Sequence, residues 1–121
     1  MKPFSIADRL KSVEHAARGV VFLFKTQHNA RIHLAATLLV VALAWWLRVS
    51  AADWRWLVLA IVLVWAAEAM NTALEHLCNV VSPGLNRSVR MAKDIGAGAV
   101  LICAAGAAVI GVLVFLPYLR V

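Results

Sequence analysis

The sequence is poor in charged residues. They make up 15% of the 121 residues, against roughly 25% in an average soluble domain, while hydrophobic residues make up 64% against roughly 45–50%. A small domain has a large surface for its volume and needs polar side chains to cover it. The composition therefore excludes a soluble globular domain and a disordered chain, and the length limits the chain to one compact unit.

Cysteines and known nucleotide-binding motifs are scarce too. Cys78 and Cys103 lie far apart in apolar sequence, which excludes the spacings typical of metal and redox sites. No GxxxxGK[ST] phosphate loop is present, and the pair Gly96 and Gly98 lacks the third glycine of a dinucleotide fingerprint. The four histidines show no metal-ligand spacing, and we interpret them as interfacial side chains: His15, His28, His33 and His76.

Three long apolar runs account for most of the sequence. A helix needs about 20 residues to cross a hydrocarbon core of about 30 Å. The second and third runs reach this length, and the first reaches it with its flanks. No run alternates with the period of two that barrel strands require. We therefore expect one all-α membrane domain over residues 1–121, with spans at about 30–48, 55–80 and 95–119.

Basic residues are distributed unevenly around these runs. Nine of the twelve precede the first run or separate the second from the third, and the others are Arg48, Arg55 and Arg120. This bias predicts a multi-pass protein whose N-terminus and second loop are cytoplasmic. A net charge of +6 placed beside apolar runs suits anionic headgroups or phosphates, and we expect no nucleic-acid partner.

The first 28 residues form a different pattern, with apolar side chains three or four positions apart. This stripe predicts an amphipathic helix at about residues 5–28 on the inner membrane surface, serving either as an anchor or as a lid or wall of a site. Its members are Ile6, Leu10, Val13, Ala17, Val20 and Phe24.

Small residues recur every four positions in the third run, which indicates close helix packing in lipid: Ala99, Cys103, Ala107 and Gly111. Three helices have little interior of their own, so we expect the chain to form oligomers.

Two carboxylates and two amides lie inside the second run, on one face of the expected helix: Glu68, Asn71, Glu75 and Asn79. A charged group at mid-membrane costs roughly 2.5–3.5 kcal/mol, so such residues are usually functional. A polar seam with protonated glutamates is the structural alternative. With Trp56 at the outer interface, Glu68 lies about 18 Å in and Glu75 about 28 Å in. The first is placed to meet a lipid's polar end and the second a cytosolic ligand.

Three cations and a carboxylate follow across the loop, where we expect the third span to start: Arg87, Arg90, Lys93 and Asp94. A helix N-terminus and cations both suit phosphate. Asp94 could instead be an N-cap, and the cations could be topology signals. Together with Glu68 and Glu75 they supply a base, magnesium ligands and phosphate partners, which phosphoryl transfer requires.

Three segments, NARIH at 29–33, EAMNTALE at 68–75 and AKDIGAG at 92–98, resemble the small bacterial integral-membrane diacylglycerol kinase family, which includes undecaprenol kinases. The resemblance extends from about Arg9 to Leu119. It implies a homotrimer in the bacterial inner membrane, with active sites shared between subunits at the cytoplasmic interface. It also implies transfer of the ATP γ-phosphate to a lipid hydroxyl, with Mg²⁺.

The same resemblance implies roles for individual residues. By this resemblance, Glu68 takes the position of the family's catalytic base, and Asn71 that of a supporting catalytic residue. Glu75 takes the position of a magnesium ligand beside the nucleotide. Gln27 stands where a second metal-binding glutamate is common. The resemblance also implies nucleotide contacts for four further residues, His15, Asn86, Lys93 and Asp94. Of these, His15 and Asn86 differ from the residues that the family usually has there.

The lipid acceptor and two other functions stay open. The run Asn29–His33 favours undecaprenol over diacylglycerol. A small channel or proton pathway would explain Glu68 and Asn71, but not the pair Lys93 and Asp94 beside a helix start. A membrane-embedded phosphatase is a further alternative, and it would need no ATP site.

Overall fold

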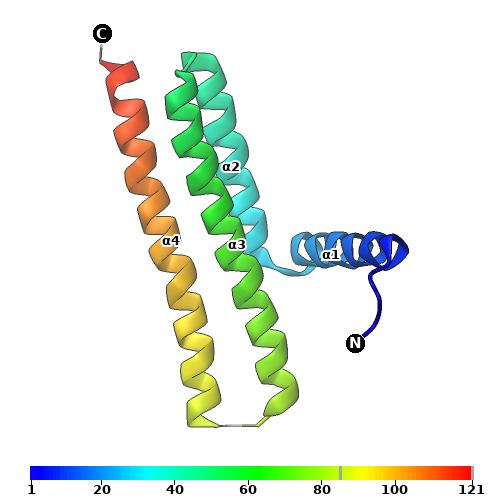
Figure 1. Ribbon diagram of the computed structural model, residues 1–121. Helices are drawn as coiled ribbons and strands as arrows, with labels where there is room; N and C mark the ends of the chain where they lie inside the picture. The colour runs from blue at the N-terminus through cyan, green and yellow to red at the C-terminus, as the bar shows by residue number, and fades with distance from the viewer. Residues whose placement is uncertain (85, 121) are drawn as a thin grey trace.

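The computed structural model describes residues 1–84 and 86–120, which form four helices (Figure 1). Helices α2, α3 and α4 run side by side, and each is long and apolar enough to cross a membrane. Helix α1 runs across their direction at the beginning of α2 (Figure 1). The expected all-helical architecture with three candidate spans is confirmed for these residues. The bounds are α1 Ile6–Thr26, α2 His28–Leu47, α3 Ala51–Val81 and α4 Arg87–Leu119.

Local signals in the sequence set the helix ends. The Ser50 side chain caps α3 by accepting a hydrogen bond from the backbone N–H of Asp53. Gln27 has an extended backbone (φ −104°, ψ 120°) and interrupts the helix between α1 and α2, where the chain changes direction. Arg48 ends α2 in the left-handed conformation (φ 52°).

Helix α4 begins well before the third apolar run. The Asn86 side-chain oxygen accepts hydrogen bonds from the backbone N–H groups of Ser88 (2.9 Å) and Val89 (3.1 Å), so Asn86 is the N-cap. Asp94 therefore lies in the third turn of α4, and the alternative that it caps the helix is wrong. The apolar run shows where the helix becomes hydrophobic, whereas the cap shows where it begins.

The three long helices are fixed to one another at the α2–α3 loop. The Tyr118 hydroxyl donates a hydrogen bond to Asp53 Oδ2 and accepts one from the Ser50 backbone N–H (2.9 Å), which ties the end of α4 to the start of α3. Beside it lies the buried apolar core, made of Ala44, Val49, Leu57, Val114 and Phe115. Farther along, α3 packs mainly against α4.

The helices differ in length, and this difference shapes the molecule. At about 1.5 Å per residue, the 20 residues of α2 extend about 30 Å, while the 31 of α3 and 33 of α4 extend about 46 and 50 Å. Helices α3 and α4 therefore continue past the level of α1 as a two-helix extension (Figure 1). Helix α1 contacts α3 through two aromatic pairs, Phe24 with Trp65 and Phe22 with His76.

Candidate active site

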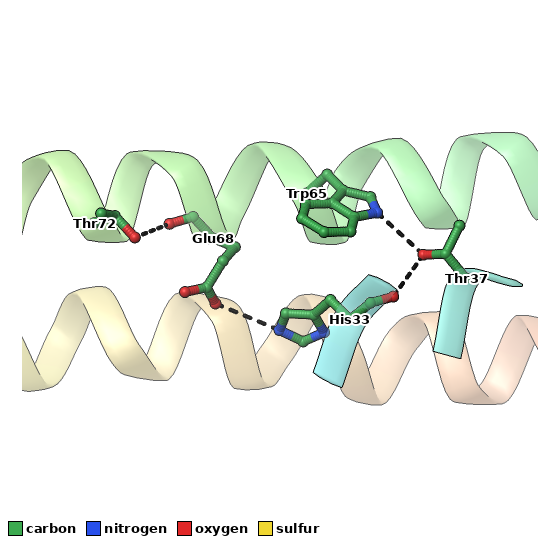
Figure 2. Close-up of polar contacts among 5 residues, drawn as sticks. All are labelled: His33, Thr37, Trp65, Glu68 and Thr72. Atoms are coloured by element: carbon green, nitrogen blue, oxygen red, sulfur yellow. Dashed lines mark hydrogen bonds and ion pairs between the residues drawn. The ribbon is translucent and has the colours of Figure 1, made fainter. Parts of the chain in front are cut away.

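Glu68 lies inside the bundle rather than facing lipid. Glu68 is only 1% exposed, and its backbone carbonyl accepts a hydrogen bond from the Thr72 hydroxyl (2.9 Å). The His33 Nε2 atom of α2 lies 3.4 Å from Glu68 Oε2 (Figure 2). Oε2 has no hydrogen-bond partner among the described residues, so the two side chains meet at ion-pair distance without hydrogen-bond geometry. A buried carboxylate thus faces a single imidazole.

His33 contacts Thr37 of its own helix and Trp65 of α3. The Thr37 hydroxyl donates a hydrogen bond to the His33 backbone carbonyl (2.7 Å) and accepts one from Trp65 Nε1 (3.0 Å) (Figure 2). The Trp65 ring stands edge-on to the His33 ring, with centroids 6.2 Å apart. On its other side Trp65 contacts Phe24 of α1, with centroids 4.9 Å apart. Three helices therefore meet around the buried pair.

Asn71 lies one turn beyond Glu68, where α3 and α4 come closest. An added Cβ on Gly96 would lie 2.5 Å from Asn71 Oδ1 and 3.0 Å from Leu74 Cδ2, so a larger residue would force the Asn71 side chain or the helices to move. Asn71 Oδ1 is buried and has no hydrogen-bond partner in the described part of the chain. Two acceptor oxygens, one each on Glu68 and Asn71, therefore lack a donor within the protein described here. Such groups are rare unless a ligand completes them.

An open hollow lies between the C-terminal end of α3 and the N-terminal end of α4, on the two-helix extension. Its volume is about 930 Å³, which is within the range of small-molecule sites. Lys93 Nζ donates a hydrogen bond to Asn79 Oδ1 across it, and Glu75 is half-buried in its wall. The polar and charged lining residues are Glu75, Asn79, Ser82, Asn86, Arg87, Arg90, Lys93 and Asp94.

The buried pair of Glu68 and His33 and the open hollow lie at successive levels along α3. Glu68 and Glu75 are separated by two turns of α3, a rise of about 10 Å. Neither Glu68 nor Asn71 lines the hollow, whereas Glu75, Lys93 and Asp94 all do. The site therefore has a buried acidic level and an open, mostly cationic level.

The remaining predicted residues differ in their placement. Asn86 lines the hollow, but its side-chain oxygen is engaged in capping α4. His15 is exposed on α1, and Gln27 is half-buried at the α1–α2 junction; neither lines the hollow. Over residues 1–84 and 86–120, no three His, Cys, Asp or Glu side chains come together as a metal site. The single chain thus brings Glu75 to the hollow without Gln27.

An apolar groove leads away from His33 between the three long helices. Its volume is about 530 Å³, and its walls are almost entirely hydrocarbon. It begins at His33 and Thr37 and follows the helices toward the α2–α3 loop, past Val40, Leu57, Ala107, Phe115 and Leu119. A lipid chain lying in this groove would place its polar end beside His33.

Sequence reasoning, which interprets His33 as an interfacial histidine, does not predict its contact with Glu68. A signal was present in the helix lengths. His33 lies about 21 Å from the Leu47 end of α2, and Glu68 about 26 Å from the Ala51 start of α3. The two helices are joined by a short loop and run antiparallel, so these residues were bound to lie at similar depth.

Comparisons with known proteins identify the family of this chain. Residues 14–115 match the prokaryotic diacylglycerol kinase family. An undecaprenol kinase of Bacillus subtilis is 34% identical over 109 residues, which cover 90% of this chain and 89% of that protein. A diacylglycerol kinase of Synechocystis is 37% identical over 109 residues, which cover 89% of this chain and 62% of that longer relative.

Proposed function

Because the chain belongs to the prokaryotic diacylglycerol kinase family, we infer that it is an ATP-dependent lipid kinase of the membrane. We propose that it transfers the γ-phosphate of ATP to the hydroxyl of a lipid alcohol at the boundary between its buried and open levels. The main support is the position of Glu68, buried beside the apolar groove and two turns from the hollow that contains Glu75 and Lys93.

We propose that Glu68 is the catalytic base and that Asn71 supports it. Glu68 would accept the hydroxyl proton of the lipid as the lipid oxygen attacks the γ-phosphorus. The Asn71 oxygen lies one turn farther along the same face and would orient the incoming hydroxyl group. Both oxygens lack a donor in the described protein, which fits a site completed by substrate.

The hollow is the proposed site of the nucleotide. Lys93, with Arg87 and Arg90, would neutralise the charge of the phosphates, and Asp94 and Asn86 would contact the rest of the nucleotide. The Glu75 carboxylate is the type of oxygen ligand that Mg²⁺ prefers, so the hollow fits that ion. When bound, magnesium would offset negative charge on the phosphates.

The helix lengths support a specific position in the membrane. Helix α2 is about 30 Å long, which equals the thickness of a hydrocarbon core. We propose that α1, which exposes Ile6, Leu10 and Val13, lies amphipathically on the inner surface at the start of α2, with the N-terminus in the cytoplasm. Glu68 then lies at the inner edge of the hydrocarbon, and the hollow lies in the cytoplasm. Because α3 begins at Ala51, both acidic residues lie deeper toward the cytoplasm than a count from Trp56 suggests.

We further propose that the active form is a homotrimer in the bacterial inner membrane. The chain leaves long apolar faces of its three spans exposed, among them Leu38, Leu101 and Ile102. Among the described residues, His15 and Gln27 also lie outside the hollow that contains Glu75. A neighbouring subunit whose α1 reached this hollow would bring these residues together.

We favour undecaprenol as the acceptor over diacylglycerol. The undecaprenol kinase relative matches over nearly its full length, whereas the diacylglycerol kinase relative extends beyond the matched region. The single apolar groove ending at His33 also suits one long chain with a terminal hydroxyl.

The decisive experiment measures ATP consumption by the purified protein in detergent, with undecaprenol, with diacylglycerol and without lipid. We expect ADP release only when a lipid alcohol is present, with the higher kcat/KM for undecaprenol. ATP hydrolysis without lipid, or no stabilisation of the protein by Mg-ATP against heat, would favour the channel or phosphatase alternatives.

A further inference from the structure

His33 closes the run at residues 29–33 but has no part in the expected catalytic set. We propose that His33 is a positioning residue, whose positive charge keeps the Glu68 carboxylate ionised and directed toward the lipid hydroxyl. This proposal rests on the proposed function, in which Glu68 is the base. It assigns to α2 a direct part in the reaction, through the 3.4 Å contact between His33 Nε2 and Glu68 Oε2.

The burial of Glu68 creates the requirement for such a partner. A carboxylate removed from water is costly to ionise unless a cation or several donors lie beside it. Glu68 is 1% exposed, and its Oε2 accepts no hydrogen bond within residues 1–84 and 86–120. His33 Nε2 is the titratable nitrogen that this part of the chain brings within 4 Å of it. An uncharged Glu68 could not accept a proton.

Thr37 and Trp65 lie beside His33. Thr37 bonds the His33 backbone carbonyl and also holds the Trp65 indole, which packs edge-on against the imidazole (Figure 2). The His33 side chain is 16% exposed, so it is shielded but not sealed from the surface. His33 lies only five residues into α2, about 8 Å from the end that adjoins α1. In this proposal, protons leave the pair toward this end of α2.

The proton balance of the reaction is straightforward with this pair. We assign a protonated, positively charged imidazole to His33 and an ionised carboxylate to Glu68 in the resting state, so that the buried pair is neutral overall. The lipid oxygen forms its bond to the γ-phosphorus while the bond from that phosphorus to the bridging oxygen of ADP breaks. The electron pair leaves with ADP, and the lipid hydroxyl proton moves to Glu68. After the lipid phosphate departs, the extra proton passes to water and the neutral pair is restored.

A charge series at position 33 tests the proposal in the full-length protein in detergent. His33→Gln removes the charge and keeps a polar side chain of similar length, whereas His33→Lys keeps a cation. We expect His33→Gln to lower kcat about 10²-fold with little change in the KM values for ATP and lipid. We expect the kcat of His33→Lys to be at least tenfold higher than that of His33→Gln. His28→Gln, at the exposed start of α2, is the matched control and should behave as the native protein.

Infrared spectroscopy supplies a readout that does not depend on turnover. A protonated, buried carboxylic acid gives a separate carbonyl band. We expect this band in His33→Gln, but not in the native protein or His33→Lys, and we expect Glu68→Gln to abolish it in the double variant. If His33→Gln fails to fold, His33→Phe takes its place in the same spectra.

Two results would overturn the proposal: the absence of the acid band in every neutral variant, or a native kcat in His33→Gln. The spectra also separate this proposal from the proposed function. If Glu68→Gln kept full turnover, Glu68 would not be the base. The appearance of the acid band would even then show that His33 controls the charge of Glu68.

Discussion

Replacing Gly96 with alanine tests whether the close approach of α3 and α4 sets the geometry of the site. The added Cβ would lie 2.5 Å from Asn71 Oδ1 and 3.0 Å from Leu74 Cδ2. The Asn71 carboxamide must therefore move, or the helices must separate. Gly98, one half-turn away on α4, has no atom within 4 Å of an added Cβ, so Gly98→Ala is the matched control.

The two effects of Gly96→Ala on stability oppose each other. Overpacking a well-filled contact costs about 1–3 kcal/mol, whereas exchanging glycine for alanine within a helix gains about 1 kcal/mol. The net loss in the free energy of unfolding should therefore be at most about 2 kcal/mol. Activity should suffer more, because displacing a catalytic group by about 1 Å can cost about 10²-fold in rate. Gly98→Ala should be neutral or slightly stabilising.

The assays are lipid-dependent ADP release and thermal unfolding in detergent. We expect Gly96→Ala to lower kcat about 10²-fold while the protein stays folded and still gains stability from Mg-ATP. Asn71→Ala in the Gly96→Ala background removes the clashing oxygen, so this double variant should unfold at a higher temperature than Gly96→Ala alone. Native kcat in Gly96→Ala would refute the argument that this contact positions Asn71.

Three further substitutions separate the parts of the site. Glu68→Gln should lower kcat by at least about 10²-fold and leave thermal stabilisation by Mg-ATP in place, since the side chain lies outside the hollow; unchanged kcat would show that another group is the base. Glu75→Gln should raise the KM for Mg-ATP about tenfold in steady-state assays, because it weakens a magnesium ligand, and an unchanged KM would remove Glu75 from the metal site. Tyr118→Phe should lower the free energy of unfolding by about 1–3 kcal/mol, because it leaves Asp53 and Ser50 without their shared hydroxyl; kcat should stay native, and a large loss of kcat would contradict the distance of this cluster from the site.

Most of the architecture could be predicted because it depends on local patterns. The apolar runs specify helices that the bilayer requires, and residues such as Glu68, Asn71 and Glu75 share a face through helix geometry alone. The start of α4 could not be read from hydropathy, because residues 87–94 are polar yet helical and depend on the Asn86 cap. Asn86 itself shows the ambiguity: its side chain was predicted to contact nucleotide, and it also caps the helix.

Contacts between helices are where sequence reasoning fell short, and the reason is geometric. A helix face is known from the residue numbers, but which face turns toward which neighbour depends on the packing of all helices together. Glu68 was predicted to meet a lipid hydroxyl, but its contact with His33 of α2 was not predicted. The contact of Gly96 with Asn71 was not predicted either, because it depends on the close packing of α3 against α4. The pairing of His33 with Glu68 follows only when the loop at residues 48–50 fixes α2 and α3 as antiparallel neighbours of matched depth. His33 and Glu68 lie about 21 and 26 Å from the two helix ends that this loop joins, so the short loop brings a titratable side chain of α2 to nearly the depth of the buried carboxylate of α3.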